Sequence, residues 1–313
     1  MNRTGLAAGV AAYALWGLFP LYWPLLEPSG SAEILAHRVV WSFAFLVIVL
    51  ALTSGFRWLA TVGRRRAKLL ALAAVLVTVN WGIFIYGVNS GHVVETSLGY
   101  FINPLVSVTL GVLVLGERLT RGQRIAVAIA ALAVVVLAVD YGRPPWIALT
   151  LAGTFGGYGL IKNRVGMEGT PSVAIETAYL LLPALGFIAW LEATGRGTFA
   201  DHSGGHAALI AAGGVVTAVP LMLFGAAAIR IPLSTLGVLQ YITPSMHWLI
   251  GVFVRGEPMP AARLAGFALV WVALAVFTAD ALGRAHRGRR SADDEHIEQP
   301  RPVDALHPVE LDV

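Results

Sequence analysis

Charged and aromatic side chains with a spacing that fits a binding or proton-transfer site occur in an otherwise apolar stretch. Glu33, His37 and Trp41 are spaced four residues apart, so they share one face of a helix, and Arg38 lies beside them. Glu95 begins a later apolar segment at the same level. A carboxylate, an imidazole and a guanidinium that converge near an entrance would bind an anionic or zwitterionic solute, or transfer a proton. The alternative is that these side chains are solvated in the membrane interface.

A second group combines amide and aromatic side chains near the expected middle of the bilayer. Its members are Asn80, Trp81, Tyr100, Asn103, Gln240 and Tyr241. Pro104 follows one part of the group and Pro244 follows another. A proline at such a place frees a backbone carbonyl for a ligand or a neighbouring side chain. We expect these residues to line a substrate pocket for an amphipathic solute, with helix–helix hydrogen bonding as the alternative.

Glu176 is a carboxylate inside a further apolar segment, and the sequence near it offers no basic residue to neutralise it. A carboxyl group in apolar surroundings favours its neutral form, which can carry a proton. We therefore predict proton coupling through Glu176, Glu33 or Glu95. An ion-paired or cavity-facing structural glutamate is the alternative. Trp16, Tyr22, His247 and Trp248 are assigned to packing or to interfacial belts.

The sequence gives no sign of catalysis. It contains no His-Glu-x-x-His, no Gly-x-Ser-x-Gly and no nucleotide-binding Gly-x-x-x-x-Gly-Lys pattern. It also contains no cysteine, which excludes disulfides and thiolate metal sites. Asp201, His202 and His206 resemble a metal cluster, but they fall in a glycine-rich segment and are predicted to form a solvated loop. We expect no enzyme activity, no cofactor and no metal.

Composition indicates that these residues are carried by membrane helices. Of the 313 residues, 57% are hydrophobic and 13% are charged, about half the charge of a soluble domain. The mean hydropathy is +0.73. Apolar runs near the length that crosses a bilayer recur along the chain. We predict an all-α polytopic membrane protein with ten spans, at 5–26, 32–53, 69–88, 93–115, 123–139, 146–161, 171–191, 207–228, 233–254 and 260–280.

The distribution of basic residues predicts the orientation. Sixteen of the 22 arginines and lysines fall on one side of the predicted spans and five on the other. This bias favours cytoplasmic N- and C-termini. Because the basic residues lie between apolar runs, the pI of about 9.6 is not taken as a sign of nucleic-acid binding. Residues 283–313 are predicted to form a disordered cytoplasmic tail.

An internal repeat relates the two halves of the chain. Gly116-Glu117 follows Pro104 by the same interval at which Gly256-Glu257 follows Pro244, and the same shift matches Asp140 with Asp280. Five spans in each half is an odd number, so the second copy would enter the membrane from the opposite side. We predict two inverted five-helix repeats, at 1–140 and 141–282. The Asp pair is expected to mark helix ends, and Pro258 suggests that the second Gly-Glu terminates a helix.

Several of these strings resemble a known family. The run from Glu95 to Pro104 (ETSLGYFINP), followed by Leu-Gly-Glu-Arg118, resembles the EamA family of the drug/metabolite transporter superfamily. The run from Glu33 to Ser42 (EILAHRVVWS) is similar to its RarD branch, as are Asn80-Trp81, Ile175-Glu176-Thr177 and residues 233–242. The resemblance covers about residues 5–282. It implies a ten-helix inner-membrane carrier with two EamA repeats, in a branch associated by name with chloramphenicol sensitivity.

The function that we predict is secondary active transport of a small metabolite or drug-like solute by alternating access, with proton coupling. The partners are then the small-molecule substrate, the lipid bilayer and protons, with no nucleic acid. The oligomeric state is left open. One alternative is a flippase for a lipid-linked intermediate, which would need a cavity open sideways to lipid. The other is a non-transporting receptor or assembly partner, against which the inverted duplication argues.

Overall fold

The chain is helical throughout the residues that the structure describes. The computed structural model describes residues 2–298 except 54, 116–117, 168, 201, 229, 232–234 and 236–238. The Gly116-Glu117 motif, Asp201, most of residues 232–238 and the end of the predicted tail therefore lie outside the described residues. The described elements are α1 (Arg3–Gly17), α2 (Phe19–Tyr22), η1 (Trp23–Leu26), α3 (Ser31–Leu52), η2 (Arg57–Thr61), α4 (Arg64–Asn89), α5 (Val93–Leu115), α6 (Arg121–Tyr141), α7 (Trp146–Val165), α8 (Gly169–Ala193), α9 (Gly204–Ala228), α11 (Ile242–Leu249), η3 (Ile250–Val254) and α12 (Ala261–Glu298).

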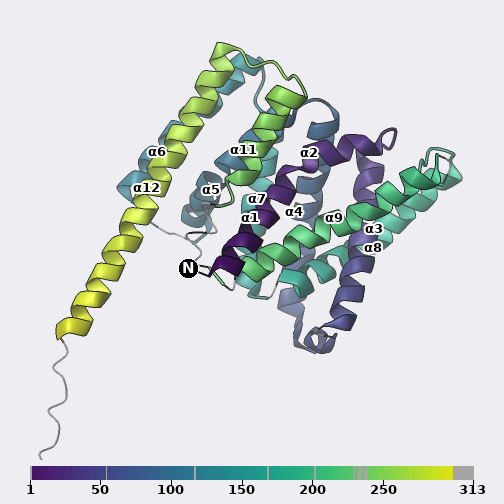
Figure 1. The fold of residues 1–313 in the computed structure, drawn as a ribbon, viewed down its shortest axis with the longest axis horizontal. Coiled ribbons are helices and arrows are strands. Elements are labelled where there is room, and N and C mark those ends of the chain that lie inside the picture. Colours follow the sequence, from purple (N-terminus) through teal and green to yellow (C-terminus); the bar gives the residue numbers. More distant parts are fainter. Residues whose placement is uncertain are drawn as a thin grey trace, which may run out of the picture.

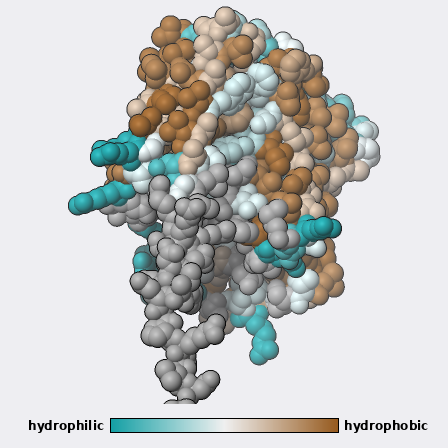
Figure 2. Space-filling model, turned by 60° about the vertical axis from the view of Figure 1, so that its left-hand side comes forward, coloured by the Kyte–Doolittle hydropathy of each residue, from teal (hydrophilic) through white to brown (hydrophobic). Residues whose placement is uncertain are grey.

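Eight of these helical segments are long and apolar enough to cross a membrane. The apolar stretch Ile242–Val254 is shorter, and α7 is a further helix of 20 residues. Large apolar side chains such as Leu52, Val139 and Leu182 are about four-fifths exposed, as expected for surfaces that face lipid. Figure 2 shows such apolar side chains spread over the visible side of the molecule. The chain is a multi-pass membrane protein.

Local sequence signals explain several helix ends. Thr120 and Gln123 form a reciprocal capping box at the start of α6, and Gly142 ends this helix with a φ of +63°. The first predicted span is broken after Gly17, where α1 gives way to α2 and η1. Pro20 and Pro24 account for the break because they lack the amide hydrogen that a continuous helix needs.

The C-terminal helix is longer than predicted. α12 continues past residue 280 to Glu298, so the segment from 283 to 298, predicted to be disordered, is helical. The reason lies in its composition: helix-forming Ala, Arg and Glu residues follow the span and no proline occurs before Pro300. In Figure 1 this helix extends well beyond the other helices.

The side of the molecule that carries the starts of α1, α4 and α6, at Arg3, Arg64 and Arg121, is called the basic face. The opposite face carries the starts of α3, α5, α7 and α9.

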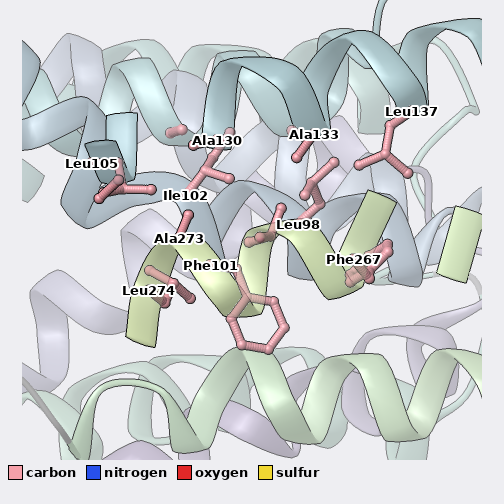
Figure 3. Packing of buried hydrophobic residues seen from close by; sticks show 14 of the residues in the cluster. Leu98, Phe101, Ile102, Leu105, Ala130, Ala133, Leu137, Phe267, Ala273 and Leu274 are labelled. Atoms are coloured by element: carbon pink, nitrogen blue, oxygen red, sulfur yellow. The ribbon is translucent and has the colours of Figure 1, made fainter. Parts of the chain in front are cut away.

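α6 and α12 pack against each other at one end of the molecule, while α3, α8 and α9 form the other end (Figure 1). The α5–α6–α12 cluster holds the first end together. It includes Leu98, Phe101, Ile102 and Leu105 of α5, Ala130, Ala133 and Leu137 of α6, and Phe267, Ala273 and Leu274 of α12 (Figure 3).

Two side-chain hydrogen bonds, one near each end of α6, join this helix to α12. Arg263, near the start of α12, pairs with Asp140 near the end of α6, with 2.8 Å between Nε and Oδ2. Thr120, at the start of α6, donates its hydroxyl to Asp280, also at 2.8 Å. The start of α12 therefore lies beside the end of α6, and the start of α6 lies beside Asp280 of α12, so the two helices run antiparallel. The expectation that the Asp pair marks helix ends is confirmed for Asp140 and is wrong for Asp280, because α12 continues to Glu298.

Candidate functional site

Arg38 lies on α3, seven residues from its start on the opposite face, or about 10 Å along the helix. Its side chain is buried, with 3% of its surface exposed. Its Nε donates to Thr217 Oγ1 of α9 at 2.9 Å. Its guanidinium carbon lies 3.9 Å from the ring centroid of Trp81 and 5.1 Å from that of Trp23. The sequence pointed to Arg38 and Trp81, but it gave no sign that Trp23 and Thr217 would surround the same cation.

Arg38 has no carboxylate partner in the described part of the chain. The three ion pairs found there join Arg143 with Glu95, Lys162 with Glu176, and Arg263 with Asp140. Arg38 Nη1 is buried and makes no hydrogen bond to any described residue. Aromatic faces stabilise a desolvated cation by about 2 kcal/mol, which offsets only part of the cost of holding it at membrane depth. The arrangement suits a site that receives an anion.

Asn80 and Tyr100 lie together, as the sequence predicted. Tyr100 of α5 donates its hydroxyl to Asn80 Oδ1 at 3.2 Å. Asn80 Nδ2 in turn donates to the Leu151 carbonyl and to the Thr154 hydroxyl of α7, both at 3.0 Å. Because both the oxygen and the nitrogen of its side-chain amide are hydrogen-bonded, Asn80 connects α4 with α5 and α7. This contact matches the alternative of helix–helix hydrogen bonding, and Asn80 positions the Tyr100 ring at the site.

His247 of α11 is a residue that the sequence analysis assigned to packing. Its ring stacks on Phe84 at 5.1 Å between centroids and meets the Tyr100 ring edge-on at 5.9 Å. Nε2 lies 3.1 Å from the Trp16 carbonyl, while Nδ1 is buried without a hydrogen-bond partner among the described residues. The only signal in the sequence was a histidine three residues after Pro244, which does not reveal contacts with α4 and α5.

His37 and Trp41 face the same aromatic ring. Phe199, in the segment between α8 and α9, stacks on His37 at 4.6 Å and lies 6.1 Å from Trp41. The predicted stripe on α3 is therefore confirmed for these two residues. Glu33 is held separately, because its Oε1 accepts hydrogen bonds from the Thr198 amide at 2.7 Å and from the Thr198 hydroxyl at 3.1 Å.

Glu95 does not join this group. Its carboxylate pairs with Arg143 at 2.8 Å and accepts a hydrogen bond from the Ile147 amide at 3.0 Å. The hydrogen bond to Glu95 raises the pKa of Arg143 further above its usual value. The expected convergence of Glu95 with His37 and Arg38 is wrong, since the sequence did not reveal that Arg143 would fold onto Glu95.

Glu95 and Arg143 line a hollow of about 200 Å³ on the opposite face, together with Gly91, His92, Tyr141, Glu257, Pro258 and Arg263. Glu257 of the second Gly-Glu motif accepts hydrogen bonds there from the Val93 and Val94 amides, so it caps the start of α5. Burial raises the pKa of the Glu257 carboxyl. Gly256 has a φ of +67°, which a glycine adopts without strain, and η3 ends at Val254. The expectation that this motif terminates a helix is confirmed.

Glu176 is paired with a lysine. Lys162 Nζ lies 2.7 Å from Glu176 Oε1, and the carboxylate also accepts from the Ser172 hydroxyl at 2.9 Å and from the Tyr158 hydroxyl at 3.0 Å. The expectation of a carboxylate without a basic partner is wrong, and the contact matches the alternative of an ion-paired structural glutamate. The reason is that α7 ends at Val165 and α8 begins at Gly169, so only a short connection separates residues 158 and 162 from residues 172 and 176.

The remaining residues of the predicted pocket are Asn103, Gln240 and Tyr241. Asn103 is buried, and its Oδ1 has no hydrogen-bond partner among the described residues. Tyr241 packs on the α5–α6–α12 cluster, and Gln240 precedes it, half-buried, in a turn before α11.

His206 is buried at the start of α9 and lies 2.9 Å from the Ser29 hydroxyl, so the prediction of a solvated loop is wrong for this residue. The helix begins three residues earlier than predicted, which draws His206 into the protein. Among the described residues, no cluster of three or more His, Asp or Glu side chains could hold a metal ion.

Comparison with known proteins gives consistent matches. Residues 3–139 match the model of the EamA-like transporter family. Protein RarD of Streptomyces exfoliatus is 57% identical over 290 residues, which cover 92% of each chain. The uncharacterized transporter YojE of Bacillus subtilis (strain 168) is 42% identical over 285 residues, covering 88% of this chain and 94% of that one. A crystal structure that is 18% identical, with a TM-score of 0.54, covers 88% of this chain and 98% of its own, and it shows the fold alone.

Proposed function

Because the chain belongs to the RarD branch of the EamA-like transporter family, we propose that this transporter is a secondary active carrier that works by alternating access. Its cargo would be a small metabolite or drug-like solute, bound near Arg38, Trp81 and Tyr100. Ten membrane spans, as two inverted repeats at 1–140 and 141–282, would form the carrier, with residues 283–313 as a cytoplasmic extension. Both termini would lie on the cytoplasmic side of a bacterial inner membrane.

The observation that carries this proposal is the exchange of partners between the two halves. A shift of 140 residues converts α1, α3, α4 and α6 into the regions of α7, α8, α9 and α12. The pair α1–α9 then corresponds to α7–α4, and the pair α3–α9 corresponds to α8–α4; all four pairs are in contact. α3–α8 and α6–α12 are pairs of related helices, and the second pair runs antiparallel. Such packing supports two states of similar energy that open to opposite sides.

Proton coupling is the mechanism that we propose for energising transport. The Lys162–Glu176 pair at the basic face and His37 on the opposite side offer titratable groups on both sides of Arg38. A proton that neutralises Glu176 would weaken its attraction to Lys162 and loosen the α7–α8 contact. Coupling requires such an alternation, because a proton must be bound in one state and released in the other.

The test is flux from proteoliposomes that contain the purified protein and a mixed metabolite extract. Mass spectrometry would follow which solutes leave, with and without an imposed pH gradient. We expect at least one solute to leave only when the protein is present, and faster with the gradient. Scrambling of labelled lipid without solute flux would replace the proposal with a flippase. No flux from vesicles with folded protein would favour a receptor or an assembly partner.

Variants separate the coupling from the transport. Glu176→Gln and His37→Ala are expected to reduce gradient-driven flux. Solute exchange in the absence of a gradient should be unchanged in both variants. If both variants leave gradient-driven flux unchanged, proton coupling through these residues is wrong, although transport itself would stand.

A further inference from the structure

We propose that the transported solute is a monoanion with a carboxylate on an aromatic or apolar body, and that Arg38 binds the carboxylate between Trp81 and Trp23. This inference names the substrate class of the proposed carrier and therefore rests on the proposed function. It depends on the charge of the site, on which of its hydrogen-bond groups are free, and on the nature of its walls.

The charge of Arg38 calls for an anion. The side chain is 97% buried at a depth of about 10 Å along a membrane helix, and none of the ion pairs in the described part of the chain includes it. An arginine in such a place costs about 2.5–3.5 kcal/mol on insertion scales, and such residues face a cavity or pair with another group. Lys162, a half-buried cation at the basic face, already has its carboxylate in Glu176. Arg38 does not, so the anion would come from the solute.

Two free hydrogen-bond groups, one on the guanidinium and one on an aromatic ring beside it, are donors. Arg38 Nη1 and Trp23 Nε1 are buried without a partner among the described residues, and neither can accept a hydrogen bond. Arg38 Nε is occupied by Thr217 Oγ1, which itself donates to the Gly213 carbonyl at 2.8 Å. Thr217 therefore fixes the guanidinium while Nη1 stays free. These two donors beside a cation match a carboxylate and do not match an amine or another cation.

The aromatic side chains around the guanidinium favour a solute with an apolar or aromatic body. Trp81, Trp23 and Phe19 surround the guanidinium with centroids 3.9, 5.1 and 5.6 Å from its carbon. Phe19, Trp23 and Phe84 belong to one buried cluster, against which Trp16, Trp41 and Tyr100 also pack. Aromatic rings in such an arrangement stack on a flat solute and exclude water from the ion pair.

The site discriminates against an amino-acid zwitterion. An ammonium group would need a carboxylate to balance its charge beside Arg38, but Glu33 is occupied by Thr198 and Glu95 by Arg143 and Ile147. A zwitterion would therefore leave its positive charge unpaired beside Arg38. We expect phenylacetate to bind more tightly than phenylalanine.

The test is direct binding to the full-length protein in detergent, which does not depend on transport. Ligand-dependent shifts of the melting temperature would be compared for phenylacetate, 1-naphthoate, their neutral amides, phenylalanine and chloride. We expect the two carboxylates to stabilise the protein and the amides, phenylalanine and chloride to have at most a weak effect. Equal stabilisation by acids and amides would overturn the inference, as would stabilisation by chloride equal to that by the aromatic acids.

Variants assign the effect to Arg38. Arg38→Gln is expected to weaken carboxylate binding by at least about tenfold, which is the loss of one charge-assisted pair, and Arg38→Lys by less. Arg196→Gln, an exposed arginine in the α8–α9 connection, is the matched control and should change nothing. If Arg38→Gln does not fold, Trp81→Leu keeps the cation and should weaken naphthoate more than a short aliphatic acid. Unchanged affinity in Arg38→Gln, or equal weakening of both acids in Trp81→Leu, would overturn the inference.

The failure of this inference can be told apart from the failure of transport. Carboxylate binding without any flux would retain the site and contradict the carrier. Flux of a neutral solute that Arg38→Gln does not change would retain the carrier and contradict the anion site.

Discussion

Lys162, Arg143 and Arg38 differ in what neutralises their charge. Lys162 lies against Glu176, and Arg143 reaches Glu95 from a position that is one-third exposed. Arg38 is the most deeply buried of the three and lies among aromatic rings. A structural role explains the two ion pairs, because each joins neighbouring helices or their connections. It does not explain Arg38, whose only direct hydrogen bond in the described region is to Thr217.

The Lys162–Glu176 pair provides a first prediction at the residue scale. Lys162→Met leaves the Glu176 charge buried with only hydroxyl partners, so we expect a loss of about 3–5 kcal/mol. The double variant Lys162→Met with Glu176→Gln removes the unpaired charge and should recover most of that loss. Unfolding in mixed micelles measures both. Lys68→Met, at an exposed position on the basic face, is the matched control. A double variant as unstable as the single one would show that the charge is not the cause.

Glu257 gives a prediction for pH. Burial raises its pKa in the folded protein above the unfolded value of about 4.3. Between those two values the unfolded chain is ionised while the folded chain still holds the proton. Stability due to this group is therefore complete below about pH 4.3 and is lost as the pH rises through the folded pKa, by at most about 1.4 kcal/mol per unit.

The measurement is the melting temperature of the protein and of Glu257→Gln against pH. The parent is expected to lose stability relative to the variant as the pH rises above about 4.3, and to reach a constant difference above the folded pKa. Glu27→Gln, an exposed glutamate on the same face, should give a curve parallel to that of the parent in this window. A difference between parent and Glu257→Gln that does not vary with pH would contradict the assignment.

Residue types predicted part of the site. Asn80 and Tyr100 were expected in one pocket, and they are hydrogen-bonded to each other. The sequence predicted this because their positions on consecutive apolar helices already indicated their depth in the membrane. Helical spacing also predicted that His37 and Trp41 share a face. The partners of Glu95 and Glu176 were missed, as were the contacts of His247, because these depend on which helices are neighbours. Spacing along one helix contains no such information.

At the scale of elements, the crossing of α3 and α9 positions Arg38 against Thr217. The two helices approach at Gly214, where an added Cβ would lie 2.4 Å from the backbone carbon of Trp41. Backbone cannot move aside as a flexible side chain can, so the helices must separate. Arg38 precedes Trp41 by less than one turn and would move with it.

We therefore expect Gly214→Ala to destabilise the protein by about 1–3 kcal/mol through overpacking and to weaken carboxylate binding. Gly225→Ala is a matched control on the same helix, since an added Cβ there meets nothing within 4 Å. Replacing this glycine should be neutral or slightly stabilising. Melting temperature and ligand titration measure both effects. Equal behaviour of the two variants would show that the crossing does not set the site.

Most span boundaries were predicted to within a few residues, because apolar runs end at charged or glycine-rich segments that also end the helices. α12 is an exception that continues past its predicted end at residue 280 to Glu298, and α4 is another that begins five residues early at Arg64. Its basic residues are good helix formers, and a hydropathy criterion excludes them. As a result, Asn80 lies past the middle of the helix, on the side of the opposite face. Hydropathy measures the width of the apolar layer, whereas helix ends depend on capping and proline.

At the scale of the whole molecule, the proposed orientation can be tested with single cysteines, because the natural chain has none. Thr194→Cys places a thiol at an exposed position on the opposite face, and Ala60→Cys places one on the basic face. A membrane-impermeant maleimide added to intact cells should label the first and not the second. Both should react after the membrane is permeabilised. The reverse pattern would invert the topology, and it would also assign the Arg38 site to the cytoplasmic half.

The Glu257 cap has a consequence for the order in which the protein is made. Glu257 lies 164 residues after Val93, and its carboxylate accepts a hydrogen bond from the Val93 amide. A ribosome that adds about 5–20 residues each second needs roughly 10–30 s to cover that interval. Throughout this time α5 has entered the membrane without its cap, so the first half remains incomplete until nearly all of the second half has followed. Quality control would then act on the finished pair of halves, and a ribosome that stalls before residue 257 would release a chain with an open helix end.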